Sequence, residues 1–402
     1  MKILIIHNAY QQPGGEDVVV ARESNLLMRE GNEVTTYKRS NHELDSLSFL
    51  QKLGLVRRIV SAKDSKTGVR QLIRNFQPDV VHVHNTFLMV SPAVYEVCRE
   101  ENVPVVQTLH NYRLLCPAST FYRNDGVCED CVTHGLLRSV KHACYRDSRA
   151  MSAAVALMLK THRSLQTWAK KVDAYIAISR FAANKFVKAG FPANKMFVKP
   201  NFVDPDPGER TRPGDYALFV GRLSPEKGLS TLIQAWRRLP ALIPLMIVGD
   251  GPMRRQLAVD AAAAGLNNIR FVGQLPRDEV YTAMKKAAFL VVPSVWQEPF
   301  GLIAAEAFGC GTPVLGARIG AIPEMLEHEV TGLQFSPSDP DDLARQVAWA
   351  WEHPAHLTAM GKSARKVYEQ RYTARANYAS LREIYASTIN RSKRIRALRA
   401  TA

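Results

Sequence analysis

The 402-residue sequence contains no apolar run that approaches the ~18–20 residues needed for a membrane-spanning helix. Its first residues, Met1 to His7, become polar too soon for a secretory signal peptide, so we expect a cytoplasmic protein. We also find no nucleic-acid-binding motif and no interleaving of basic with aromatic residues that would stack bases. These absences exclude a membrane-spanning protein and leave charge as the one feature in favour of nucleic-acid binding.

What is present is an ordinary globular composition with a strong basic excess. Hydrophobic residues make up 46% and charged residues 22% of the chain, and its length allows two domains, each with a core. The 53 Lys and Arg outnumber the 37 Asp and Glu, which gives a net charge of +16. Basic residues gather mainly in the first half and the tail, at 57–58, 63–74, 138–141, 160–171 and 391–399. Such a surface favours nucleic acid or anionic lipid, or simply keeps the protein soluble.

Short hydrophobic strands alternate with helical segments along the chain. The first half is predicted to have strands at 3–7, 33–37, 79–84, 103–109 and 174–179, and helices at 18–30, 70–76, 90–102, 152–171 and 180–189. Repeated strand–helix units imply a parallel sheet with helices on both faces, which is a Rossmann-like domain. A proline-rich linker at 204–208 precedes a second such sheet, which begins at Tyr216.

The segment from Glu298 to Pro313 carries the most specific signal. A buried strand at 289–292 leads into a loop that holds Glu298 and then into a helix that starts near Gly301. Free N–H groups and the dipole at a helix start form an anion site. Glu306, farther into the helix, would reach hydroxyl groups beyond the anion. The pattern suits a phosphorylated, polyhydroxylated ligand, and the alternative is an exposed acid before a packed helix.

Two cations occupy another glycine loop. A strand at 216–220 ends in Gly221-Arg222, and Lys227 follows before a helix at 229–239. Arginine offers a planar fork to phosphate oxygens, and lysine offers a mobile point charge. The carboxyl ends of strands are where ligands bind in open α/β sheets, so we predict a ligand-facing pair. The alternative is an ordinary solvated surface pair.

In their order, these motifs resemble the donor half of family-four retaining glycosyltransferases, which use nucleotide sugars and have the two-domain GT-B architecture. The matching segments are Gly221-Arg222-Leu223, Glu226-Lys227-Gly228, Gly249-Asp250-Gly251-Pro252, the Glu298/Glu306 motif, Gly311-Thr312-Pro313-Val314, Ile322-Pro323-Glu324 and Thr331-Gly332-Leu333. The resemblance implies two Rossmann-like domains that face a cleft, with a final helix that crosses back to the first domain. We predict an acceptor domain at 1–204, a donor domain at 205–371, and a crossover helix with a basic tail at 372–402.

The resemblance also implies roles for single residues of the second half. Arg222 and Lys227 would neutralise the diphosphate leaving group as its charge grows. Glu306 should hold the ribose hydroxyls, and Glu298 the hydroxyls of the transferred sugar. We expect no catalytic metal, because side-chain cations would replace Mg²⁺. The backbone N–H groups that would assist the cations are those of Phe300, Gly301 and Leu302.

Two features of the first half match the same family. His110 follows the strand at 103–109, and the family has a histidine at this position that contacts the transferred sugar. Without the resemblance, such a histidine is most often structural. The loop Gly14-Gly15-Glu16 precedes the first helix, and in the family this loop faces the acceptor. The alternative there is a mere tight turn. His82 and His84 share one side of their strand, and we assign them no chemical role.

A cysteine-rich insertion near 111–147 directly follows His110. Cys128 and Cys131 have the two-residue spacing of a metal-binding pair, and Cys116 and Cys144 flank them at similar distances. Disulfides are not expected in a reducing cytoplasm. We therefore predict that the four cysteines bind a structural zinc ion as thiolates and so stabilise this loop. An iron–sulfur cluster and ordinary thiols remain alternatives.

We therefore interpret the protein as a retaining hexosyltransferase that uses a nucleoside-diphosphate sugar. The acceptor would be a glycan or a polyprenyl-linked sugar of bacterial exopolysaccharide, capsule or lipopolysaccharide synthesis. The basic charge would hold the enzyme peripherally at the inner face of the cell membrane. A sugar-nucleotide epimerase shares the fold but needs no acceptor. A non-enzymatic nucleic-acid-binding protein is favoured only by the charge.

Overall fold

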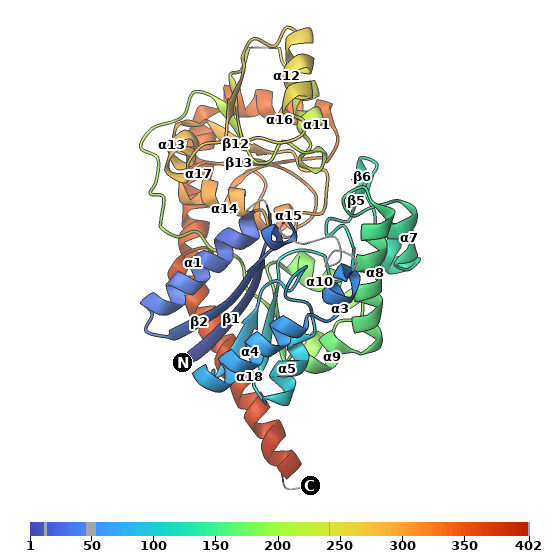
Figure 1. Ribbon diagram of the computed structural model, residues 1–402. Coiled ribbons are helices and arrows are strands. Elements are labelled where there is room, and N and C mark those ends of the chain that lie inside the picture. The colour runs from blue at the N-terminus through green and yellow to red at the C-terminus, as the bar shows by residue number, and fades with distance from the viewer. Residues whose placement is uncertain (12–13, 46–53, 241, 401–402) are drawn as a thin grey trace. The chain divides into compact units, whose positions relative to one another are not determined.

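The computed structural model of the protein describes residues 1–11, 14–45, 54–240 and 242–400 (Figure 1). The chain forms two compact units, which we describe separately. The first unit consists of Met1–Thr120, Glu129–Lys199 and Asn377–Ala402, and the second of Phe121–Cys128 and Pro200–Ala376. No helix in these described ranges is long and apolar enough to cross a membrane.

The first unit is built on a parallel sheet. Its strands, in spatial order, are β2 (Glu33–Ser40), β1 (Lys2–Ala9), β3 (Val80–Val83), β4 (Val105–Leu109), β7 (Ala174–Ala177) and β8 (Met196–Val198). Successive residues of β1, from Ile3 to Ile6, are all buried, as expected for a sheet covered by helices on both faces. The chain winds outward in both directions from β1, so the carboxyl ends of β1 and β3 flank the point where the strand order reverses.

Helices cover this sheet. They are α1 (Gly15–Arg29), α3 (Leu55–Val60), α4 (Lys63–Phe76), α5 (Val94–Glu100), α6 (Asp130–Thr133), α7 (Leu137–Lys141), α8 (Arg149–Ser164), α9 (Thr167–Lys171) and α10 (Arg180–Lys188), with 3₁₀ turns at Asn41–Leu44 and Ala193–Lys195. The single helix predicted at 152–171 is wrong, because Gln166 adopts the left-handed conformation (φ 51°) and separates α8 from α9. The turn is held by His162, whose ring bonds Thr167 and the carbonyl oxygen of Val60.

The long last helix, α18 (Ala374–Ala400), belongs to the first unit from Asn377 onward. Its side chains Leu381, Ile384 and Tyr385 are buried in the same core as Ile3 and Ile5 of β1. The expectation that the final helix returns to the first domain is therefore confirmed.

The second unit contains another parallel sheet. Its strands are β11 (Ile269–Gly273), β10 (Leu245–Val248), β9 (Ala217–Val220), β12 (Phe289–Val292), β13 (Val314–Ala317) and β14 (Gly332–Phe335). The helices are α11 (Leu229–Trp236), α12 (Arg254–Ala263), α13 (Arg277–Lys286), α14 (Leu302–Gly309), α15 (Ile322–Met325), α16 (Pro340–Glu352) and α17 (Pro354–Arg371), with a 3₁₀ turn at Pro225–Lys227 and a small hairpin of β5 (Tyr122–Arg123) and β6 (Gly126–Val127). The strand order reverses between β9 and β12, so loops after these strands lie where α/β sheets bind ligands.

Candidate functional site

The loop after β9 carries both predicted cations, and a glycine controls its path. Gly228 has φ 71°, and a Cβ atom there would lie 1.8 Å from the carbonyl oxygen of Pro293, at the end of β12. Only glycine permits that approach, because any side chain would collide with the backbone. The loops after β9 and β12 are therefore in direct contact, although about 70 residues separate them in the chain.

This contact brings Lys227 to Glu298. The ammonium Nζ lies 2.5 Å from Oε1 of Glu298, which also accepts a hydrogen bond from the Ser294 hydroxyl at 2.9 Å. The same ammonium lies 5.3 Å from the centre of the Trp296 ring, within the range of a cation–π contact. Glu298 is buried at 7% exposure, so Lys227 compensates a charge that has little access to water. From the sequence we assigned Lys227 to the diphosphate and Glu298 to the sugar hydroxyls, and we did not predict their contact with each other. We also gave no role to Ser294 and Trp296.

Arg222 differs from Lys227 in that it has no hydrogen-bond or ion-pair partner among the described residues. Its side chain is exposed, and no described residue accepts a hydrogen bond from its guanidinium. The planar fork therefore remains available to an anion from outside the chain.

The start of α14 presents backbone donors next to Glu298. Gly301 precedes the helix with φ 104°, and none of the described side chains caps the helix start. In the described part of the chain, the N–H groups of Phe300, Gly301 and Leu302 have no acceptor. Unsatisfied N–H groups at a helix start attract anions, and the helix dipole adds to the effect.

Glu306 lies farther along α14 and is 8% exposed. The hydroxyl of Tyr281, from α13, donates to its Oε1 over 3.3 Å. Tyr281 was not predicted, because nothing in the local sequence of α13 shows that it packs against α14.

In the first unit, His110 lies directly after β4 and is buried at 8% exposure. Its Nε2 lies 2.9 Å from Nδ1 of His84, at the end of β3, and the two rings are stacked. Burial lowers the pKa of His110 to about 3, and that of His84 well below its usual value. Both imidazoles are therefore neutral at physiological pH and act through hydrogen bonds rather than charge.

The glycine loop begins α1, with Gly14 as its N-cap, Gly15 as its first residue and Glu16 in its first turn. Oε2 of Glu16 accepts hydrogen bonds from the Tyr10 hydroxyl at 3.2 Å and from Nδ2 of Asn111, the neighbour of His110, at 2.9 Å. Burial and the nearby Asp17 raise the pKa of Glu16 to about 8, so this carboxyl is protonated at neutral pH. Sequence reasoning missed Tyr10 and Asn111.

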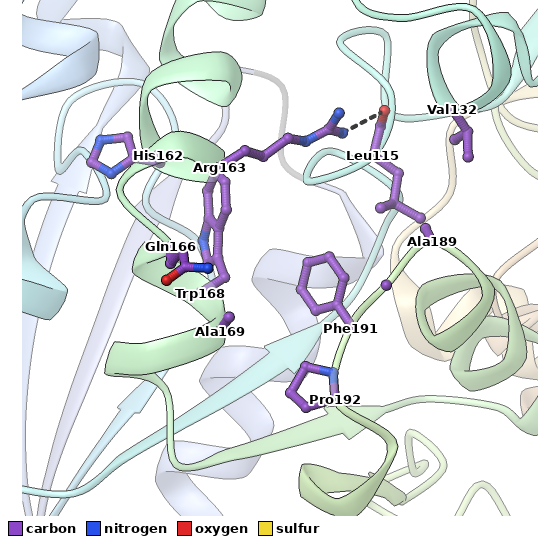
Figure 2. Close-up of a pocket in the computed structure, with 11 residues that line it drawn as sticks. Leu115, Val132, His162, Arg163, Gln166, Trp168, Ala169, Ala189, Phe191 and Pro192 are labelled. Atoms are coloured by element: carbon purple, nitrogen blue, oxygen red, sulfur yellow. Dashed lines mark hydrogen bonds between the residues drawn. The ribbon is translucent and has the colours of Figure 1, made fainter.

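Two of the clustered cysteines, Cys116 and Cys131, are buried, whereas Cys128 and Cys144 are partly exposed. The neighbours of the buried pair, Leu115 and Val132, line a cavity of about 260 Å³ in the first unit (Figure 2). Figure 2 also shows Arg163 of α8 reaching the carbonyl oxygen of Leu115, at 3.2 Å. None of the predicted sugar- or phosphate-binding residues lines this cavity.

Comparison with known proteins identifies relatives of both halves. Residues 13–207 match the family model described as Glycosyltransferase Family 4, and residues 206–367 match the model described as Glycosyl transferases group 1. Among curated proteins, the D-rhamnosyltransferase WbpZ of Pseudomonas aeruginosa is 34% identical over 40% of this chain and 42% of its own length. A glycogen synthase of Mycobacterium tuberculosis is 30% identical over 73% of this chain.

The chain spans 42% and 65% of the length of these two relatives. Among solved structures, the Anabaena protein HepE in complex with UDP superposes with a TM-score of 0.71. The comparison covers 96% of this chain and all of HepE at 19% identity, so it shows the fold alone. It confirms the predicted GT-B architecture. Because the two model matches together cover 13–367 in the order of the two units, the chain belongs to the family 4 glycosyltransferases.

Proposed function

We propose that the protein is a retaining glycosyltransferase that moves a hexose from a nucleoside-diphosphate sugar to a glycan or lipid-linked acceptor. The observation that carries this proposal is the contact between Lys227 and Glu298 at the point of strand reversal. In a nucleotide sugar, the sugar is attached directly to the second phosphate. Lys227 would bind the second phosphate, and the adjacent Glu298 would bind the hydroxyls of the sugar attached to it.

The donor site would stabilise the leaving group electrostatically. As the bond between the sugar and the phosphate oxygen breaks, negative charge grows on the diphosphate. Arg222, Lys227 and the N–H groups at the start of α14 would meet this charge without reorganisation. Such a set of donors needs no divalent cation, and we propose that none takes part. The complex of HepE with UDP supports a nucleoside diphosphate as the ligand of this fold.

Donor screening tests the proposal. The protein should cleave one of the common UDP-, GDP- or dTDP-sugars, release the nucleoside diphosphate, and transfer the sugar with the configuration at its anomeric carbon unchanged. An isomerised nucleotide sugar without release of nucleotide would instead identify an epimerase. Tight binding of nucleic acid with a steep salt dependence, and no donor cleavage, would support the non-enzymatic alternative.

We propose that the cysteine-rich insertion holds a structural zinc ion through Cys116, Cys128, Cys131 and Cys144. Two of these side chains, Cys116 and Cys131, are buried, whereas no three of the four sulfur atoms, all in the described part of the chain, lie within 4.8 Å of one another. The proposal rests on the spacing of Cys128 and Cys131, which is typical of a metal-binding pair, and on the two cysteines that flank them. The ion would order a segment that has few core side chains of its own.

Metal analysis tests this site. Protein purified without chelator should contain about one zinc ion per chain, as one four-thiolate site requires. Cys131→Ser should lose the metal and lower the melting temperature. Cys98→Ala, at a buried cysteine outside the insertion, should retain the metal. Metal-free wild-type protein with four titratable thiols in the insertion would refute the site.

We propose that the first unit associates with anionic membrane surfaces. Helices α3 and α7 both pack against α8, and the three helices expose both apolar and basic side chains. Val56, Leu137 and Leu157 are 42%, 80% and 47% exposed. The exposed basic residues on the same helices include Arg57, Arg138, Lys141 and Lys160. Each basic residue near an anionic surface contributes on the order of 1 kcal/mol to the free energy of membrane binding. Exposed apolar side chains contribute further by inserting into the headgroup region.

Vesicle flotation tests this association. Vesicles with anionic lipid should bind the protein at low salt and release it at high salt, whereas neutral vesicles should bind it weakly. Leu137→Glu should reduce binding. The matched control is Leu242→Glu, at an equally exposed leucine (80%) of the second unit, which should bind as wild type does. Equal loss in both variants, or no binding to anionic vesicles, would contradict the proposal.

A further inference from the structure

A series of buried polar side chains in the first unit links Lys199 to His110. Nζ of Lys199 donates to Oε2 of Glu23 at 2.8 Å, and both side chains are almost completely buried. The second oxygen of Glu23, Oε1, lies 3.6 Å from Nε2 of His84. Nδ1 of His84 in turn lies 2.9 Å from Nε2 of His110. A fixed ion pair in the core is thus connected, through one imidazole, to the histidine at the end of β4.

Two atoms in this series have no hydrogen-bond partner among the residues that the structure describes. They are Oε1 of Glu23 and Nε2 of His84, which are buried and lie 3.6 Å apart. Oε1 also lies 3.3 Å from Nδ1 of His82, but that nitrogen already has the Tyr385 hydroxyl as its partner. Burial raises the pKa of Glu23, but the Lys199 ammonium and the neighbouring histidines outweigh it and lower the pKa overall. Glu23 is therefore a carboxylate that can only accept hydrogen bonds. The ordinary way to satisfy both atoms is a proton on Nε2 of His84, directed at Oε1.

The protonation state then propagates to His110. A neutral imidazole carries one proton, so a proton on Nε2 of His84 leaves its Nδ1 as an acceptor. Nε2 of His110 must then donate to it, and Nδ1 of His110 is left with a lone pair. In the described part of the chain no residue donates to that Nδ1. We propose that Glu23 sets the tautomer of His110 through His84, so that His110 presents Nδ1 as an acceptor for a ligand hydroxyl.

A metal ion is the other use that these side chains suggest. Potential ligand atoms of Glu23, His82 and His84 lie within 4.8 Å of one another. However, Nδ1 of His82 is already 2.7 Å from the Tyr385 hydroxyl, and its Nε2 is 2.7 Å from the Thr108 hydroxyl. The Lys199 ammonium on the same carboxylate would also repel a divalent cation in this dry environment. The observations therefore favour the hydrogen-bonded series.

Glu23 and His84 are positioning residues in this scheme, which rests on the proposed function only for the identity of the hydroxyl. A transferred sugar, whose hydroxyls both donate and accept, would donate to Nδ1 of His110. In the opposite tautomer Nδ1 of His110 carries the proton and is a hydrogen-bond donor. A ligand hydroxyl at that position would then have to accept the hydrogen bond instead of donating it. The series thus fixes which hydrogen-bonding pattern the ligand must present.

Nitrogen NMR of the full chain labelled with ¹⁵N-histidine tests the tautomer without any substrate, with the His110 signals assigned by their loss in His110→Gln. Nε2 of His110 should show a protonated shift and Nδ1 an unprotonated one. Glu23→Gln should reverse the two shifts. The Lys199 ammonium can only donate hydrogen bonds, so it should bond the oxygen of the new amide. The NH₂ group of that amide would then point toward Nε2 of His84. His84 would then donate to His110. The matched control, Thr167→Val, removes the hydroxyl that lies 2.9 Å from Nδ1 of His162, a buried histidine outside this series, and should leave both shifts unchanged.

The outcomes separate this inference from the proposed function. A wild-type His110 protonated on Nδ1 overturns the inference even if the variants do not fold, and so does an unchanged tautomer in folded Glu23→Gln. Stoichiometric metal in wild-type protein that is lost in His82→Ala would show a metal site instead. If the tautomer reverses, turnover of the donor should also fall roughly three- to tenfold, the effect of one lost neutral hydrogen bond. Reversal with unchanged turnover would support the series and remove His110 from the proposed reaction.

Discussion

Replacing Lys227 or Arg222 with alanine is expected to lower turnover by roughly 10²–10³-fold. This is the usual effect of removing one preorganised group that stabilises charge in the transition state. Binding of the free nucleoside diphosphate should weaken in parallel, because both cations would contact phosphate in product and transition state. Steady-state kinetics and calorimetry measure the two effects. Arg255→Ala, at an exposed arginine of α12 in the same unit, provides a matched control and should behave as wild type.

The two variants should differ in folding stability. Lys227→Ala leaves the buried Glu298 without its cation, and an unpaired buried charge is costly, so the melting temperature should fall. Arg222→Ala removes a side chain that has no partner among the described residues and should leave the melting temperature unchanged. The double variant Lys227→Met, Glu298→Gln should recover stability but not turnover. Wild-type kinetics in both single variants would remove the assignment of the donor site.

The second large effect concerns Glu298 and Glu306. Glu306→Ala should weaken both the donor and the free nucleotide by roughly 10–100-fold, because each contains the ribose that this carboxylate is proposed to hold. Glu298→Ala should impair use of the donor to a similar degree. It should not weaken the free nucleoside diphosphate, and the release of Lys227 from Glu298 should even favour the phosphates. The reverse pattern in calorimetry would contradict this division of roles.

Tyr281→Phe offers a graded control for this comparison. It removes the hydroxyl that donates to Oε1 of Glu306 and leaves the carboxylate in place. Nucleotide binding should weaken by less than tenfold, in line with one hydrogen bond. A loss as large as that of Glu306→Ala would mean that Glu306 acts through the packing of α13 on α14 rather than on the ribose.

The α/β class and the loops of the candidate donor site could be read from the sequence because their signals are local. Alternation of short apolar strands with helical segments predicts parallel sheets, and glycine after a strand marks the turn that approaches a ligand. The same locality explains the error at 152–171. Helical periodicity continues across Gln166, whereas the turn there depends on His162 and on Val60 from α3, which is distant in the chain.

Only the tertiary structure decided which side chains meet. Lys227 and Glu298 come together because β9 and β12 are neighbours at the strand reversal and because Gly228 lets the two loops touch. Glu23, His84, His110 and Lys199 converge from helix α1, the ends of β3 and β4, and the segment after β8. The alternation of strands and helices does not encode strand order, which is set by the packing of the whole sheet. The sequence by itself therefore determined the type of fold and the chemistry of each loop, whereas the pairing of charges and the hydrogen-bonded series depend on long-range contacts.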